Sequence, residues 1–235
     1  MKYKAVFFDL DGTLVPMDND EFTKGYFTEL TKKISPLGIA PDDLVSAIWA
    51  GTKAMVKNDG SKKNVDVFCE TFSAVTGKEI SLFKGPCDEF YVKEFAEARK
   101  YTAENPDAVK AVELAKKSGA KVVLASNPVF PLDGQLMRMS WVGLKKDDFD
   151  YITSYESESF CKPNPEYYRA VCEKLGVLPS ECLHIGNDEG EDMKAAGSIG
   201  IDCYLITDCI IKREGIEYNG KKGSFSELIS FLETI

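Results

Sequence analysis

Residues 4–15, KAVFFDLDGTLV, begin as an apolar run and end in two aspartates, a glycine and a threonine. The run from Lys4 to Phe8 has little polar alternation, which predicts a β-strand covered on both faces, as in a parallel sheet. Asp9 and Asp11 follow this strand and point the same way if the extended geometry persists. Two carboxylates in one pocket repel each other, so the pair indicates a bound cation or a shared proton more than a simple turn.

Downstream of residue 105 the sequence alternates between predicted helices and strands. Two helices are framed alike by an Asn N-cap, a Pro in the first turn and a Gly stop, namely Asn105, Pro106 and Gly119, then Asn164, Pro165 and Gly176. Strands are expected within 121–126, 150–154, 182–186 and 202–207, a helix over 189–200, and a last helix at the capping box of Ser224 and Glu227. This order predicts an α/β fold with a doubly wound parallel sheet.

Residues 16–105 follow a different pattern, with amphipathic stretches such as 20–34 and 41–56 separated by Gly and Pro. The sequence therefore predicts two domains: an α/β core from residues 1–15 and 106–235, and a helical domain inserted from 16 to 105. Trp49 and the phenylalanines of the insertion are interpreted as its core. Residues 18–27 and 58–64 are candidates to face an active site, although solvated surface is the simpler interpretation.

The composition restricts the class of partner. The chain has 235 residues, with 29 basic against 38 acidic side chains and a net charge of −9. This charge argues against nucleic acid binding but allows a small local phosphate site. Seven cysteines without zinc-type spacing are typical of free thiols in a reducing cytosol. Without a signal-like N-terminus or a long apolar segment, we expect a soluble cytoplasmic protein that does not bind membranes.

The polar motifs of the α/β region all follow predicted strands. Ser126 and Asn127 follow the second strand, Lys162 precedes the helix after the third, and the fourth leads into Asn187, Asp188 and Asp192. Ligands of such sheets bind at the carboxyl ends of the strands, so we expect these groups to meet Asp9 and Asp11. Oxygen ligands without His or Cys favour a hard cation, and few carboxylates with room for water favour Mg²⁺.

In these motifs the chain resembles the haloacid dehalogenase (HAD) superfamily, in its phosphatase branch. The resemblance rests on DLDGT (9–13), Ser126, Lys162 in CKPNP, and GNDEGED (186–192), in that order. It covers the whole Rossmann-like core, and the helical insertion resembles the helical cap domain that this superfamily places after its first motif. The resemblance implies an aspartyl-phosphate mechanism that uses Mg²⁺.

The resemblance also implies roles for individual residues. Asp9 is the expected nucleophile, Asp11 the general acid and base, and Lys162 the group that compensates negative charge. Ser126 and the backbone N–H groups of Leu10, Asp11 and Asn127 would bind the phosphoryl oxygens. The metal would be held by Asp9, the backbone carbonyl of Asp11 and Asp188.

The fourth motif departs from the commonest wording of the family, which has an acid directly after the glycine. Asn187 occupies that place here, and Asp188 follows. The interpretation that we favour makes Asp188 the metal ligand, with Asp192 holding Lys162 or a metal-bound water; the alternative is the amide oxygen of Asn187. His184 lies within a predicted buried strand and is interpreted as a core residue.

The expected function is Mg²⁺-dependent hydrolysis of a phosphomonoester of a small cytosolic metabolite. A phosphomutase would keep the same motifs and stays open. A 2-haloacid dehalogenase is disfavoured because that branch lacks an acid at the position of Asp11, and a catalytically silent binding module is disfavoured by the intact motifs. The sequence leaves the substrate, the oligomeric state and the extent of cap movement open.

Overall fold

A computed structural model describes residues 2–235 and contains one six-stranded parallel sheet in the order β3-β2-β1-β4-β5-β6. Its strands are β1 (Ala5–Phe8), β2 (Lys121–Leu124), β3 (Tyr151–Ile152), β4 (Cys182–Gly186), β5 (Asp202–Ile206) and β6 (Lys221–Gly223). The order reverses between β1 and β4, so the carboxyl end of β1 lies at the switch point of the sheet. The predicted α/β fold with a doubly wound parallel sheet is confirmed.

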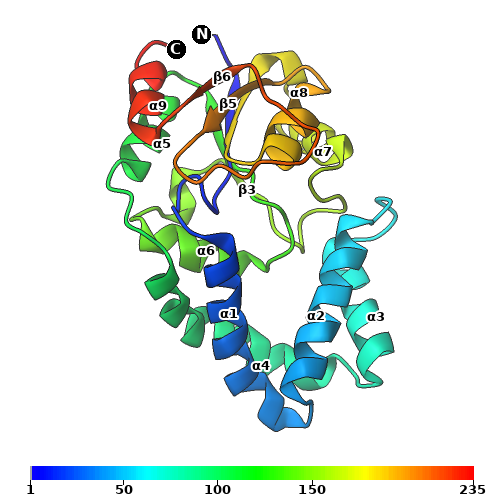
Figure 1. The fold of residues 1–235 in the computed structure, drawn as a ribbon. Coiled ribbons are helices and arrows are strands. Elements are labelled where there is room, and N and C mark those ends of the chain that lie inside the picture. The colour runs from blue at the N-terminus through cyan, green and yellow to red at the C-terminus, as the bar shows by residue number, and fades with distance from the viewer. Residues whose placement is uncertain (1) are drawn as a thin grey trace.

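Helices cover both faces of the sheet (Figure 1). Val6 and Phe8 of β1 belong to a core shared with α5 (Ala108–Lys117) and α9 (Phe225–Leu232). Ala5 and Phe7 belong to the opposite core, which includes residues of α7 (Pro165–Leu175) and α8 (Ala195–Gly197). Because successive side chains of a strand point to opposite faces, an unbroken apolar strand is what two cores require.

The predicted helix boundaries agree with the structure in one case and differ in another. Asn164 caps α7 through its side chain, which accepts from the Glu166 N–H, and Gly176 ends it in the left-handed conformation. The helix expected at Pro106 begins instead at Ala108. Asn105 closes a turn there, because its side-chain oxygen accepts from the Asp107 N–H while its amide donates to the Leu14 carbonyl.

Two features of the C-terminal region were not predicted. β6 is short and carries two exposed lysines, so it lacks the apolar pattern of a strand. The helix expected over 189–200 is a π-helical segment, Glu189–Lys194, followed by the short α8. A π turn accommodates one extra residue in a helix and is frequent at functional sites.

The helices α1 (Asn19–Ile34), α2 (Pro41–Val56), α3 (Asn64–Thr76) and α4 (Ser81–Val92), with the 3₁₀ segment η2 (Glu94–Tyr101), form a second group below the sheet, which we call the helical lobe (Figure 1). The two chain crossings into it lie side by side, since the Ala103 N–H donates to the Pro16 carbonyl at 2.8 Å. Among the described residues, no helix is both long and apolar enough to cross a bilayer. The division into domains at residues 15 and 105 stays a prediction.

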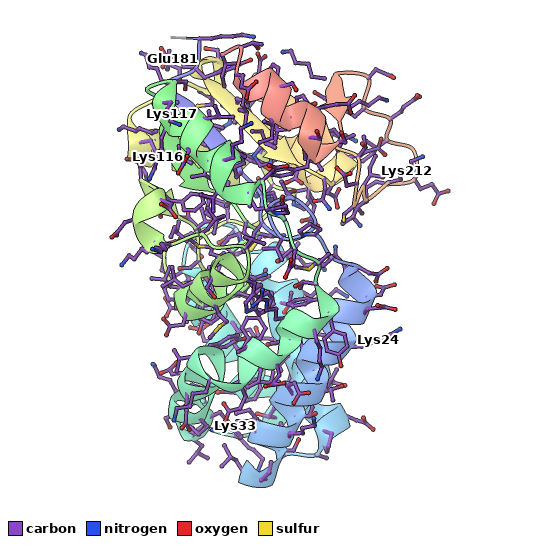
Figure 2. The ribbon with its side chains drawn as sticks, turned by 90° about the vertical axis from the view of Figure 1, so that its left-hand side faces the viewer. Lys24, Lys33, Lys116, Lys117, Glu181 and Lys212 are labelled. Carbon is purple, nitrogen blue, oxygen red and sulfur yellow. The ribbon has the colours of Figure 1, made fainter. Side chains whose placement is uncertain are left out.

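Ion pairs and aromatic rings hold the lobe together and to the core. Lys33, near the far end of α1 (Figure 2), donates to Glu89 of α4 and to Glu94 of η2, both at 2.8 Å. The remaining helix of the core, α6 (Leu132–Trp141), lies at the junction, where Trp141 packs on Phe22 of α1 with ring centroids 6.2 Å apart. The helical lobe is therefore joined to the core by packing against α6 as well as by the two chain crossings.

The N-terminal end of α3 also docks on the loops that follow the strands. The buried amide of Asn64 donates to the carbonyls of Pro128 and Phe160, at 3.3 and 3.4 Å. The Asn64 N–H donates to the Glu158 carbonyl at 2.9 Å. Of the two segments predicted to face an active site, residues 58–64 thus contact the loops that follow the strands. Asn19, Phe22 and Tyr26 of the other segment line a cavity between the core and the helical lobe, which we call the main cavity.

Candidate active site

The carboxyl end of β1 carries a buried ion pair. Asp9 lies directly after the strand, and its N–H donates to the Ile185 carbonyl of β4 at 2.9 Å. Its carboxylate oxygens accept from Lys162 Nζ at 2.9 Å and from Thr13 Oγ1 at 3.2 Å. Burial raises the pKa of Asp9 to about 7, although Lys162 opposes that rise. Ionised Asp9 is therefore unfavourable at this buried position, and the Lys162 ammonium offsets part of that cost.

Lys162 is also paired with a second buried carboxylate. Its Nζ donates to Asp192 Oδ1 at 2.6 Å, and its side chain is only 1% exposed. Burial alone would lower the pKa of Lys162, but Asp192 and Asp9 outweigh it and raise that pKa above its ordinary value. Lys162 is therefore a fixed positive charge, and a buried charge of this kind requires a paired carboxylate.

Asp192 is held by further donors. Its Oδ2 accepts from the N–H groups of Asn187 and Asp188, each at 3.0 Å, and His184 Nε2 lies 3.0 Å from its Oδ1. Burial would raise the pKa of Asp192, but Lys162 and then His184 lower it below the usual range. Burial lowers the pKa of His184, so a neutral ring donates from Nε2. His184 lies in the core as predicted, and it supports a site residue.

Asp11 is paired with an arginine that the sequence analysis missed. Arg138 of α6 is fully buried, donates to Gly134 O and Gln135 Oε1, and forms an ion pair with the Asp11 carboxylate. Its guanidinium carbon also lies 4.2 Å from the centre of the Phe130 ring. Asp11 lines the main cavity, and Arg138 contacts the Asp11 carboxylate from α6. A carboxylate beside a buried guanidinium is held in one orientation.

Ser126 and Asn127 follow β2 as predicted and line the same cavity as Asp9. The Ser126 carbonyl accepts from Thr153 Oγ1 at 2.7 Å and from Tyr167 Oη at 3.0 Å, which fixes the end of the strand. Asn127 Oδ1 accepts from the Lys162 N–H at 3.2 Å. The second and third motifs are therefore joined by a direct hydrogen bond.

Asn187 and Asp188 of the fourth motif line the same cavity as Asp9. Asn187 packs on the first motif so closely that a Cβ on Gly12, at φ +79°, would meet its amide nitrogen at 2.1 Å. Asp188 Oδ1 caps the π-helical segment by accepting from Gly190 and Glu191 N–H, at 2.8 and 2.9 Å. Its carboxylate also pairs with Arg213, whose Nε lies 2.9 Å from Oδ2. Arg213 is a second residue that the sequence analysis missed.

The residues at the cavity floor offer oxygen atoms to a cation. Asp9, Asp11, Asn187 and Asp188 all line it, and the buried Oδ1 of Asp11 has no hydrogen-bond partner among the described residues. Oxygen donors of this kind fit a hard cation such as Mg²⁺. Within residues 2–235, no group of three or more Asp, Glu, His or Cys side chains is arranged so that it could hold a metal ion by itself. A metal here would therefore also need main-chain or amide oxygens.

Above this floor lies a cavity of about 380 Å³ that extends between the core and the helical lobe. The predicted site residues Asp9, Asp11, Ser126, Asn127, Lys162, Asn187, Asp188 and Asp192 all line it. Trp49, interpreted as core, is 51% exposed and also lines this cavity. Its position was not apparent from the sequence because an aromatic on an amphipathic helix has the same pattern whether it faces a core or a cavity.

Comparison with known proteins agrees with this geometry. Residues 3–200 match the haloacid dehalogenase-like hydrolase family. A phosphatase of Mycobacterium tuberculosis is 27% identical over 223 residues, covering 92% of this chain and 93% of that protein. The phosphorylated carbohydrates phosphatase of Thermotoga maritima is 32% identical over 201 residues, covering 85% and 82%.

Solved structures of the family share the fold. A HAD phosphatase from Thermococcus onnurineus covers 97% of both chains with a TM-score of 0.61 and 22% identity. The L-2-haloacid dehalogenase from Xanthobacter autotrophicus covers 99% of both chains with a TM-score of 0.59 and 18% identity. The family match spans most of the sequence and includes the strand-end residues from Asp9 to Asp192. The chain therefore belongs to the haloacid dehalogenase-like hydrolase family.

Proposed function

We propose that the chain is a Mg²⁺-dependent phosphatase that hydrolyses a small cytoplasmic phosphomonoester through an aspartyl-phosphate on Asp9. The observation that carries this proposal is the buried Lys162 between Asp9 and Asp192, on the floor of a cavity that Asp11 also lines. A fixed cation beside a carboxylate offsets the repulsion between that carboxylate and a phosphate dianion. The two relatives named as phosphatases support the same reaction class.

In the first half-reaction an Asp9 carboxylate oxygen bonds to phosphorus and the bond from phosphorus to the leaving oxygen breaks. Asp11, protonated at this stage, gives its proton to the departing alkoxide, a role that contributes about 10²–10⁴-fold. Ser126 and the backbone N–H groups of Leu10, Asp11 and Asn127 would hold the phosphoryl oxygens, and Lys162 would balance their charge. The product alcohol then leaves through the cavity.

In the second half-reaction water attacks the same phosphorus. Asp11, now a carboxylate, takes a proton from this water, and the bond between phosphorus and Asp9 breaks to release inorganic phosphate. The Asp9 carboxylate is restored, and Lys162 again neutralises it. Both half-reactions thus use Asp11 at the same position, so its orientation matters twice in each turnover.

The metal of this proposal would be held by Asp9, the backbone carbonyl of Asp11 and Asp188. When bound, Mg²⁺ supplies positive charge that favours the approach of the phosphate to Asp9. Asp188 would exchange its pairing with Arg213 for the metal. The competing ligand is the amide oxygen of Asn187, which lies within 3.4 Å of the Thr13 hydroxyl beside Asp9.

Removal of the metal is expected to abolish turnover of an aryl phosphate, and added Mg²⁺ should restore it. Asp188→Asn should raise the Mg²⁺ concentration for half-maximal activity by roughly tenfold or more, because a charged ligand is lost. Asp192→Asn should instead lower kcat, because Asp192 contacts Lys162. Titration of activity with Mg²⁺ measures both effects. A larger Mg²⁺ effect in Asn187→Ala than in Asp188→Asn would assign the ligand to Asn187.

We assign Arg138 a positioning role, since it contacts the Asp11 carboxylate and is fully buried. Arg138→Met, which keeps most of the volume, is expected to lower kcat by about 10²-fold, within the range of acid–base catalysis. If Arg138 acts only through Asp11, Arg138→Met in an Asp11→Asn background should lower kcat no further. Steady-state kinetics of the four proteins tests this, and equal losses in both backgrounds would contradict the assignment.

The decisive experiment is release of inorganic phosphate from an aryl phosphate by the purified protein with Mg²⁺. A parallel incubation with 2-chloropropionate, followed by chloride assay, tests the dehalogenase alternative, which Asp11 disfavours. Product analysis with a sugar phosphate separates a phosphatase from a phosphomutase, because a mutase returns the phosphoryl group to the sugar. Absence of turnover with any phosphomonoester would favour a silent binding module.

A further inference from the structure

The main cavity continues from the catalytic floor into the helical lobe. Asn19, in the first turn of α1, and Phe27, two turns later, both line it. These two residues are roughly 12 Å apart along the helix axis at 1.5 Å per residue. Ile48 and Trp49 of α2 line the same cavity, and both are partly or largely exposed. The space is therefore longer than a phosphoryl group needs, and its upper part lies between the lobe helices.

The charges around this cavity are confined to one end. Its charged lining residues follow the strands of the core, namely Asp9, Asp11, Lys162, Asp188, Glu191, Asp192 and Arg213. Among the described residues of the lobe that line it, none is charged. The wall of α1 instead presents Phe22, Tyr26 and Leu30 at helical spacing. The cavity is thus polar at the floor and apolar above it.

The apolar part offers few hydrogen bonds to a bound group. The hydroxyls of Tyr26 and Tyr91 lie 2.8 Å apart and bond to each other. Phe27 of α1 and Trp49 of α2 meet with ring centroids 5.6 Å apart, and Trp49 stays 51% exposed. The other hydrogen-bonding side chains of the lobe lining are few, chiefly Asn19, Thr23 and Thr52. A sugar hydroxyl placed among the rings would therefore replace only part of its hydrogen bonds to water. A hydrocarbon group would instead gain by leaving water.

We propose that the substrate is a phosphomonoester of an apolar alcohol, with a hydrocarbon chain or ring system lying in the lobe and the phosphate at Asp9 and Lys162. The inference rests on the proposed phosphatase function and adds the class of leaving group to it. Continuity between the charged floor and the apolar wall favours a ligand with one ionic end and one apolar end. The lobe would select this ligand by burial of apolar surface.

The test is a series of n-alkyl phosphates from ethyl to hexyl, assayed with Mg²⁺ below their micellar concentrations. Each added methylene is expected to raise kcat/KM about fourfold, the factor that corresponds to about 0.8 kcal/mol per buried CH₂. Glucose 6-phosphate should be a poorer substrate than hexyl phosphate. A flat series, or a preference for the sugar phosphate, would overturn the inference. Hydrolysis of an aryl phosphate would still support the phosphatase.

Two variants assign the effect to the lobe. Ile48→Asn, on the cavity wall of α2, should flatten the dependence on chain length. Val75→Asn, at a 54% exposed position of α3 outside the cavity lining, is the matched control and should leave the dependence intact. An unchanged dependence in Ile48→Asn, confirmed as folded by circular dichroism, would contradict the assignment.

A binding measurement separates this inference from catalysis. n-Hexanol carries no phosphate and should shift the tryptophan fluorescence of the wild type, because Trp49 lines the apolar part of the cavity. The chain contains two tryptophans, so Trp49→Phe leaves Trp141 alone and should lose the shift. Hexanol binding without any phosphatase activity would refute the proposed function alone. Absence of a hexanol-induced shift in the wild type would count against the apolar site.

Discussion

Asp9→Asn is expected to lower kcat for an aryl phosphate by roughly 10⁴-fold or more, because an amide oxygen is a poor nucleophile. Asparagine keeps the shape of the side chain and an oxygen that can accept from Lys162. The contacts of Lys162 with Asp192 also remain. The loss should therefore fall on kcat while the fold persists. Single-turnover phosphate release measures it, and Asp43→Asn, an exposed position in α2, is the control.

The stability of this variant is expected to oppose its loss of activity. Burial raises the pKa of Asp9 from its ordinary value of 3.8 to about 7 in the metal-free protein. A raised carboxyl pKa means that ionised Asp9 destabilises the fold above pH 4, with the full effect above pH 7. In EDTA at pH 8, Asp9→Asn should thus unfold at the same temperature as the wild type or higher. Retained turnover would contradict the assignment of Asp9 as the nucleophile, and a strongly destabilised variant would contradict the expected effect of its buried charge.

Sequence patterns located the strands because each apolar run in a doubly wound sheet is buried on both faces. β1 is the example, with Val6 and Phe8 in one core and Ala5 and Phe7 in the other. β6 did not follow this rule, since it is an edge strand with two exposed lysines. Edge strands are stabilised by backbone pairing more than by burial, so their side chains carry little signal.

The strand-end residues were predictable because parallel strands bring their carboxyl ends to one edge. The two arginines of the site were not. Arg138 lies 127 residues from Asp11 and Arg213 lies 25 residues from Asp188, so both pairs depend on tertiary packing. One signal was available for Arg138. It lies between Gln135 and Trp141 on the buried stripe of α6, where a charged residue is costly unless it is paired.

The apolar cavity was the hardest feature to foresee. Its walls come from four helices of the lobe, and an apolar stripe at helical spacing predicts only that a helix face avoids water. Whether Phe22 or Trp49 meets another side chain or an open space depends on how far apart the helices pack. That separation is a property of the whole lobe.

Lys162→Met is expected to lower kcat/KM for an aryl phosphate by about 10³-fold, because one fixed charge that would stabilise the transition state is lost. Methionine keeps most of the length of the side chain but leaves Asp9 and Asp192 facing each other in a buried site. Removing one partner of a buried charge pair costs about 3–5 kcal/mol of unfolding free energy. The melting temperature should therefore fall by roughly 10 °C.

The double variant Lys162→Met/Asp192→Asn separates the two roles of this lysine. Removing one of the two stranded carboxylates should restore part of the melting temperature, because the repulsion between Asp9 and Asp192 disappears. Activity should stay low, because no cation remains beside Asp9 to offset its charge against the phosphate. Thermal unfolding and phosphate release measured on the same preparations test both statements. Recovery of activity together with stability would mean that Lys162 only holds the fold, and the proposed role in phosphoryl transfer would have to be abandoned.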